Sequence, residues 1–159
     1  MLVDICFTSI LSSILFSISK EDIETMHINE NKLRLFAVSG ICYLIISNYT
    51  SREINIIDLI KNNIFAIIII FTIMYLISYI SYKLLRINSL GLGDIKLSSI
   101  SSIWLGIEMV FTSLCISFLL SAIYSLHGII TKRFKRFHQY PFAPFISIGI
   151  IFSWILDKI

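Results

Sequence analysis

The sequence predicts an all-α protein, a polytopic membrane helical bundle with about six transmembrane helices. Of its 159 residues, 57% are hydrophobic and only 14% are charged, whereas about a quarter of the residues in soluble domains are charged. Several apolar runs are also long enough to cross a hydrocarbon core of about 30 Å at about 1.5 Å per helical residue. The net charge of +3 does not indicate a nucleic-acid partner, and we expect the lipid bilayer to surround the chain instead.

The predicted helices follow the apolar runs in order. These runs cover residues 2–19, 33–49, 64–82, 95–106, 109–126 and 141–156. We expect the first run to be a retained helix, because no basic residue precedes it and no A-x-A cleavage site follows it. The fourth run is short for a full crossing, so the glycine-rich stretch before it is expected to dip into the membrane, with a tight turn at Gly106. We found no internal repeat or linker, and we expect a single integral-membrane domain over residues 1–159.

The basic residues predict the orientation of the bundle. Ten of the thirteen Lys and Arg residues lie in three alternate connections, at 20–34, 83–96 and 127–140. Because cytoplasmic connections carry the excess of Lys and Arg, these three are predicted to be cytoplasmic and both termini to be on the outer, periplasmic side. The aromatic residues Trp104 and Trp154 lie near run ends, where interface anchors are expected.

The stretch Gly91-Leu92-Gly93-Asp94-Ile95-Lys96-Leu97 is the main candidate for a functional site. A carboxylate beside long apolar runs is costly, so such a residue is a functional hypothesis by default. Gly91 and Gly93 lack a Cβ, which lets another backbone or a substrate approach Asp94 closely. Lys96 has two interpretations that the sequence leaves open: a lysine that extends to the cytoplasmic interface, or a cation that tunes Asp94 or holds substrate.

Asp22 is the second candidate, because the predicted orientation places it on the same cytoplasmic side as Asp94. Two carboxyl groups held close together cannot both ionise easily, so one keeps a proton and the other becomes a base. Such a pair can activate a water molecule and protonate a leaving amine. No metal or other cofactor is required for this chemistry, and the three cysteines form no CxxC pair. Glu21, Glu24 and Glu30 are expected to form a solvated face, or alternatively to attract a basic segment of a substrate.

These motifs resemble those of the type IV prepilin peptidase family of membrane aspartic peptidases. GLGDIKL at 91–97 looks like the family's second catalytic motif. Residues 22–29 resemble its first-aspartate motif, although the family's proline is missing between Ile28 and Asn29. The segment Pro141-Phe142-Ala143-Pro144-Phe145, with a later glycine at Gly149, is similar to the family's last helix.

The resemblance implies a catalytic pair of Asp22 and Asp94, supported by Gly91, Gly93 and Lys96. It implies cleavage of the short basic leader of a type IV prepilin or pseudopilin, at the inner membrane of a bacterium, for pilus assembly or type II secretion. Longer family members also carry a segment with two CxxC pairs and N-methylate the product, and the absence of such pairs here puts methylation in doubt. The alternative is an inactive membrane transporter or a secretion or pilus assembly component.

Overall fold

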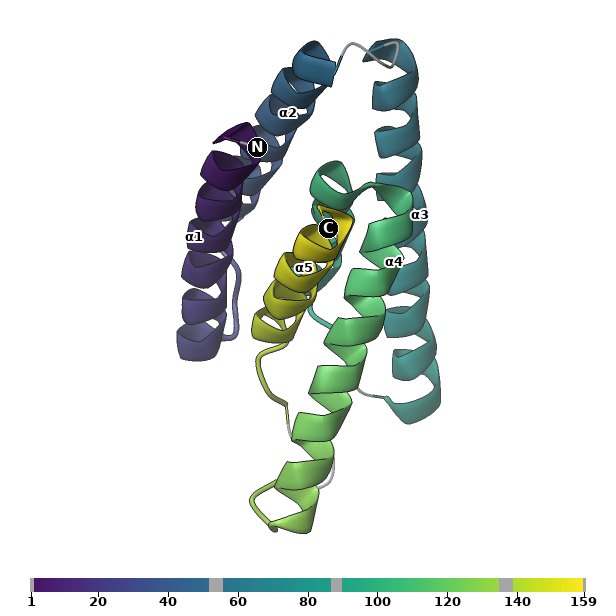
Figure 1. The fold of residues 1–159 in the computed structure, drawn as a ribbon. Coiled ribbons are helices and arrows are strands. Elements are labelled where there is room, and N and C mark those ends of the chain that lie inside the picture. Colours follow the sequence, from purple (N-terminus) through teal and green to yellow (C-terminus); the bar gives the residue numbers. More distant parts are fainter. Residues whose placement is uncertain (1, 52–55, 87–89, 135–138, 159) are drawn as a thin grey trace.

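The computed structural model describes residues 2–51, 56–86, 90–134 and 139–158, and all of its regular structure in these ranges is α-helical (Figure 1). The helices are α1 (Leu2–Thr25), α2 (Glu30–Ser51), α3 (Ile56–Leu85), α4 (Leu92–Ile130) and α5 (Ala143–Asp157). The predicted all-α bundle is confirmed, but the described part of the chain holds five helices rather than six. The difference arises in α4, which contains both the fourth and the fifth predicted runs.

A sharp reversal at Gly106 divides α4 into a first arm (residues 92–105) and a second arm (residues 107–130). Gly106 has non-helical dihedral angles, φ 71° and ψ 178°, inside α4, and glycine adopts such angles without a steric penalty. Both arms pack against α5: Trp154 contacts Trp104 of the first arm, and Gly149 contacts Ser113 of the second. The two arms therefore run side by side in opposite directions (Figure 1). The turn predicted at Gly106 is present, but it takes a single residue, so the two arms belong to one assigned helix.

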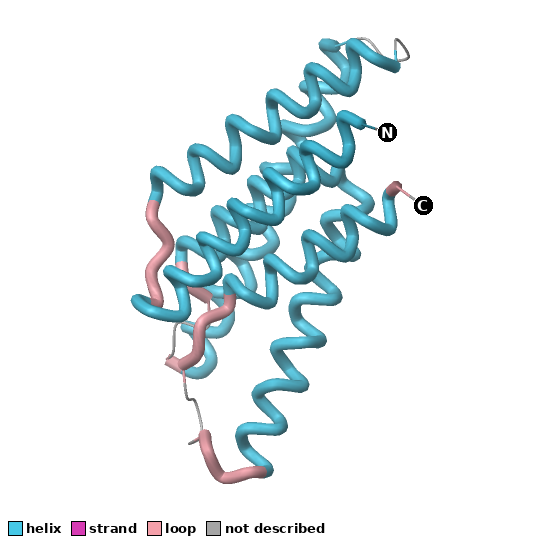
Figure 2. The backbone as a smooth tube through the Cα atoms, turned by 60° about the vertical axis from the view of Figure 1, so that its left-hand side comes forward, coloured by secondary structure: helices cyan, strands magenta, loops and turns pink. Residues whose placement is uncertain are grey.

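The bundle has two distinct ends. Helices α1, α3 and α4 end at one of them, and the N and C termini lie at the other, in both Figure 1 and Figure 2. We name these the aspartate end and the Gly106 end. Among the described residues, three helices are long and apolar enough to cross a membrane, at Val3–Thr25, Ile60–Leu84 and Leu92–Ile130, whereas α5 is shorter.

The basic connections follow the same division. The ends of α1, α3 and α4 lead into the connections that the charge count predicted to share one side. Three of the thirteen Lys and Arg residues lie outside the part of the chain that the structure describes: Arg52, Lys135 and Arg136. That these three helices end together agrees with the prediction that their connections lie on one side. Which side faces the cytoplasm stays a prediction.

An aromatic cluster forms the core near the Gly106 end. Trp104 and Trp154 are 3% and 1% exposed, and both rings contact Tyr43. Each indole N–H has an acceptor, since Trp104 donates to the carbonyl of Phe36 at 3.0 Å and Trp154 donates to Oγ1 of Thr8 at 2.8 Å. The prediction that these tryptophans are membrane-interface anchors was therefore wrong. Hydrogen bonds within the bundle satisfy their indole groups, which removes the need for water at the interface.

Small residues bring the helices close together around this core. A Cβ at Gly40 of α2 would lie 2.7 Å from Nε1 of Trp104. A Cβ at Gly149 of α5 would collide with the backbone carbonyl of Ser113 and with Oγ of Ser117 on the second arm. Small residues at such contacts are typical of membrane helix packing, where close backbone approach provides the attraction. These contacts fix the position of α5, whose N-terminus lies at the aspartate end.

Candidate active site

Asp94 is held by the first turn of α4. Gly91 is the residue that precedes the helix, with φ −71° and ψ 150°, and Asp94 is the third residue inside it. The backbone N–H of Gly91 is close enough to the Asp94 carboxyl group to stabilise its charge, which is the usual relation between the residue before a helix and the third residue inside it. Gly91 is in close contact with this carboxyl group, because a Cβ there would lie 3.3 Å from Oδ2 of Asp94. The glycine motif therefore folds the aspartate back onto its own backbone.

Gly93 has a different role from Gly91. A Cβ at Gly93 would lie 3.1 Å from Cβ of Ile28 and 3.2 Å from its Cδ1. Ile28 belongs to the connection between α1 and α2 and is 5% exposed. A side chain at Gly93 would push this connection away from α4. The absence of a Cβ thus lets the connection lie directly over the start of α4, beside Asp94.

Asp22 joins the last turns of α1 to the N-terminus of α5. Its side chain is 5% exposed, and its Oδ2 atom accepts a hydrogen bond from the backbone N–H of Ala143 at 3.0 Å. The N–H of Phe142 also bonds to this carboxyl group. Free N–H groups and the helix dipole favour a negative charge at this position. The buried carboxyl group of Asp22 therefore links the first helix to the last.

The two aspartates lie at the same end of the bundle, on the side that the sequence predicts them to share. Asp22 and Asp94 are close enough for their charges to interact, although they belong to α1 and α4. The Oδ1 atom of Asp94 is buried and has no hydrogen-bond partner among the described residues, so it can still accept a proton or a hydrogen bond. The arrangement is a pair of desolvated carboxyl groups in which Oδ1 of Asp94 has no hydrogen-bond partner among the described residues. Such a pair is suited to acid–base chemistry.

Lys96 does not direct its ammonium group at Asp94. Its Nζ atom lies 2.6 Å from Oε1 of Glu30, with the two side chains 45% and 60% exposed. The hydrogen bond from Lys96 and its positive charge hold the pKa of Glu30 below its usual range. Lys96 therefore ties the start of α2 to the start of α4, and the hypothesis that it tunes Asp94 directly has no contact to support it among the described residues.

The predicted acidic face is also partly paired. Glu21 lies 3.1 Å from Lys32, at partly buried positions, and Lys32 donates to the backbone carbonyl of Ser17. Glu24 pairs only loosely with Lys20, at 4.0 Å. Together with the pair between Lys96 and Glu30, these contacts brace the connection between α1 and α2 over the site.

Sequence reasoning missed the main-chain part of the site. The amide of Ala143 is a partner of Asp22, and a backbone N–H has no signature in the sequence. A signal was nevertheless present, since Pro144 lies in the first turn of α5, and proline there is typical of a helix start with free N–H groups. Ile28, which packs on Gly93, was noted only as part of a motif.

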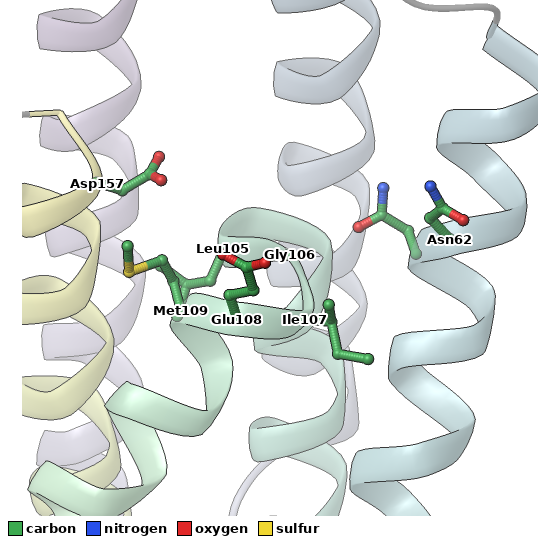
Figure 3. A pocket seen from close by; sticks show the side chains of 8 residues that line it. Asn62, Leu105, Gly106, Ile107, Glu108, Met109 and Asp157 are labelled. Carbon is green, nitrogen blue, oxygen red and sulfur yellow. The ribbon is translucent and has the colours of Figure 1, made fainter.

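A pocket of about 310 Å³ lies at the opposite end of the bundle from the aspartates (Figure 3). Its polar lining comes from Asn62 and Asn63 of α3, Glu108 of α4 and Asp157 of α5. None of the predicted site residues lines it. The aspartate pair thus does not depend on this pocket.

Comparison with known proteins shows the family of this chain. The type IV leader peptidase family matches residues 9–126, a range that includes both Asp22 and Asp94. A prepilin leader peptidase/N-methyltransferase of Bacillus subtilis (strain 168) is 32% identical over 68 residues, which cover 43% of this chain and 27% of that relative. No solved structure matches the chain. The extent of the family match shows that this chain is a member of the type IV leader peptidase family.

Proposed function

We propose that this protein is a membrane aspartic endopeptidase that removes the short basic leader of type IV prepilins or pseudopilins. Membership of the leader peptidase family supports the role in broad terms. The observation that supports the catalytic pair most strongly is the approach of two carboxyl groups, from α1 and α4, at one end of the bundle. Asp22 and Asp94 are the proposed catalytic residues, with Gly91 and Gly93 shaping the site.

In the proposed reaction, the two carboxyl groups share one proton between them, because like charges held close in a desolvated site cannot both be ionised easily. The ionised carboxylate takes a proton from a water molecule, and the water oxygen attacks the carbonyl carbon of the scissile peptide bond. The protonated carboxyl group gives its proton to the leaving amine as the C–N bond breaks. One water molecule is consumed, and the pair again holds one proton. The proton belongs to the pair rather than to either residue.

The proposed substrate has a basic leader that ends in glycine, followed by an apolar helix. The leader stays in the cytoplasm while the helix enters the bilayer, and this brings the scissile bond to the membrane surface. The aspartate end would accordingly face the cytoplasm at a bacterial inner membrane, with both termini in the periplasm. The proposed activity is cleavage of the peptide bond that follows the leader.

The competing function is that of an inactive transporter or assembly component. A transporter is expected to hold its ionisable groups near the bilayer midplane. Asp22 lies in the last turn of α1 and Asp94 in the first turn of α4, so neither carboxyl group is near the middle of its helix. This placement favours the peptidase.

The decisive experiment measures cleavage of a prepilin in cells that lack their own prepilin peptidase. Asn at position 22 or 94 keeps the size of the side chain but removes its ionisable proton. We expect Asp22→Asn and Asp94→Asn each to abolish cleavage, and the double variant to lose little more than either, because residues that act as a unit are not additive. Asp157→Asn, at the Gly106 end, is the control and should cleave normally. Immunoblotting confirms equal protein levels.

Three outcomes would contradict parts of this proposal. Substantial cleavage by Asp94→Asn would remove the basis of the mechanism. Loss of activity in Asp94→Asn but not in Asp22→Asn would mean that Asp94 works with a carboxyl group other than that of Asp22. Glu21 and Glu24 would then be the next candidates. Failure of the wild-type protein to cleave any prepilin-like substrate would favour the non-enzymatic function.

A further inference from the structure

One buried serine in the first arm of α4 differs from its neighbours. Ser98, Ser99, Ser101 and Ser102 are all at most 2% exposed. Three of them donate hydrogen bonds to carbonyl groups of their own helix: Ser99 to Ile95 at 2.7 Å, Ser101 to Ser98 at 2.7 Å, and Ser102 to Ser99. The Oγ atom of Ser98 has no partner among the described residues. Because a buried hydroxyl group without a partner is costly, Ser98 requires an explanation that the other three do not.

Another buried atom without a partner among the described residues lies one helical turn away. It is Oδ1 of Asp94, and residues 94 and 98 share one face of α4 because they are four positions apart. Helical side chains lean toward the N-terminus, so the side chain of Ser98 covers the turn that carries Asp94. The other oxygen of this carboxyl group is in contact with Gly91. The two atoms without partners are therefore one helical turn apart on one face of α4.

We propose that Ser98 is a positioning residue for Asp94, and that the two side chains bind one water molecule between Oγ and Oδ1. Residues four apart on a helix have Cβ atoms about 5–6 Å apart, which leaves room for one bridging water. A buried water needs at least two polar partners, and these two atoms provide them. With the Gly91 N–H on one side and this water on the other, the carboxyl group is held in one orientation. The inference rests on the proposed function, since it concerns the orientation of a catalytic group.

The serines beside Ser98 provide matched controls. Ser102 is also fully buried and occupies the same arm, but its hydroxyl group bonds to the backbone. Ser98→Ala removes the hydroxyl group, Ser98→Thr retains it, and Ser102→Ala removes a hydroxyl group that does not serve the site. All three variants keep a small side chain, so membrane insertion and protein level should be unchanged.

The test measures kcat and KM for a prepilin that the wild-type protein cleaves, over a range of pH. We expect Ser98→Ala to lower kcat about ten- to a hundredfold and to leave KM unchanged. This is the effect expected when one hydrogen bond to a charged group is lost. Ser98→Thr should retain most of the activity, and Ser102→Ala should match the wild type. The acid limb of the pH profile should move to higher pH only in Ser98→Ala, because a donor to the ionised carboxylate has been removed.

The outcomes distinguish this inference from the proposed function. A wild-type protein that cleaves, with Ser98→Ala and Ser102→Ala equally active or equally impaired, would overturn the role of Ser98 alone. An unchanged pH profile in Ser98→Ala would do the same. A wild-type protein that cleaves no prepilin would overturn the proposed function, and the role of Ser98 with it.

Discussion

Replacement of Asp22 should separate its structural role from its proposed chemical role. Asp22→Ala removes the acceptor for the N–H of Ala143, a residue that is fully buried. A buried donor that loses its partner costs about 1–3 kcal/mol, and loss of a negative charge at a helix N-terminus adds about 0.3–1 kcal/mol. We therefore expect Asp22→Ala to lower the free energy of unfolding by about 2–3 kcal/mol. Asp22→Asn keeps an acceptor oxygen and should cost less than about 1 kcal/mol, the net contribution of an ordinary hydrogen bond.

The assay is thermal unfolding of the purified protein in detergent, measured beside prepilin cleavage. For a chain of this length, about 2 kcal/mol corresponds to a fall in Tm of about 4–8 °C. Asp94→Ala is the matched control, because no hydrogen bond from another helix reaches its carboxyl group among the described residues, and the N–H that stabilises its charge belongs to Gly91, an exposed residue at the start of α4. We expect the free energy of unfolding of Asp94→Ala to lie within about 1 kcal/mol of the wild-type value, although this variant should be inactive.

The result that would refute this reasoning is equal stability of the two alanine variants. It would mean that the bond between Asp22 and α5 contributes nothing to the fold. A fall in Tm for Asp22→Asn as large as that for Asp22→Ala would show instead that the negative charge, rather than the acceptor atom, stabilises the start of α5.

Three further predictions concern other contacts. Gly149→Leu should destabilise the protein by about 1–3 kcal/mol, the usual cost of overpacking, since any Cβ there collides with the α4 backbone; thermal unfolding measures this, and a stable variant would contradict the close approach. The exposed Glu30–Lys96 pair should form above the unfolded pKa of Glu30, 4.5, and be lost as pH falls through its lower folded pKa, so the difference in Tm between the wild type and Glu30→Gln should disappear in acid, and a difference that does not change with pH would argue against the pair. In a variant without its native cysteines, a membrane-impermeant thiol reagent added outside the cell should label a cysteine at Glu108 but not one at Lys132, and the reverse pattern would invert the proposed orientation.

Several features of this fold are visible in the sequence because they depend on charge and length. The alternation of basic connections is sufficient to predict that Asp22 and Asp94 lie at one end of the bundle. The turn at Gly106 was located correctly, and the error in helix count came from its tightness. An apolar pattern shows where a chain must cross or turn, but not how few residues the turn requires.

Other features escaped prediction because they depend on contacts between distant segments. Trp104 and Trp154 look like interface residues in the sequence, and only the acceptors at Phe36 and Thr8 explain their burial. Lys96 is close to Asp94 in sequence, yet its partner is Glu30 from another helix. The role of the Ala143 amide could not be read from side chains at all. Periodicity and charge do not determine which partner a polar group finds across the bundle.

The bond between Asp22 and the start of α5 has a consequence for biosynthesis. The ribosome synthesises α1 early and α5 after the other four helices. The carboxyl group of Asp22 therefore lacks its amide partner from Ala143 during most of translation. Until then the carboxyl group of Asp22 has no helix N-terminus to pair with. Maturation of the site is thereby tied to synthesis of α5, and on the proposed function a nascent chain halted before residue 143 would be unable to cleave prepilins.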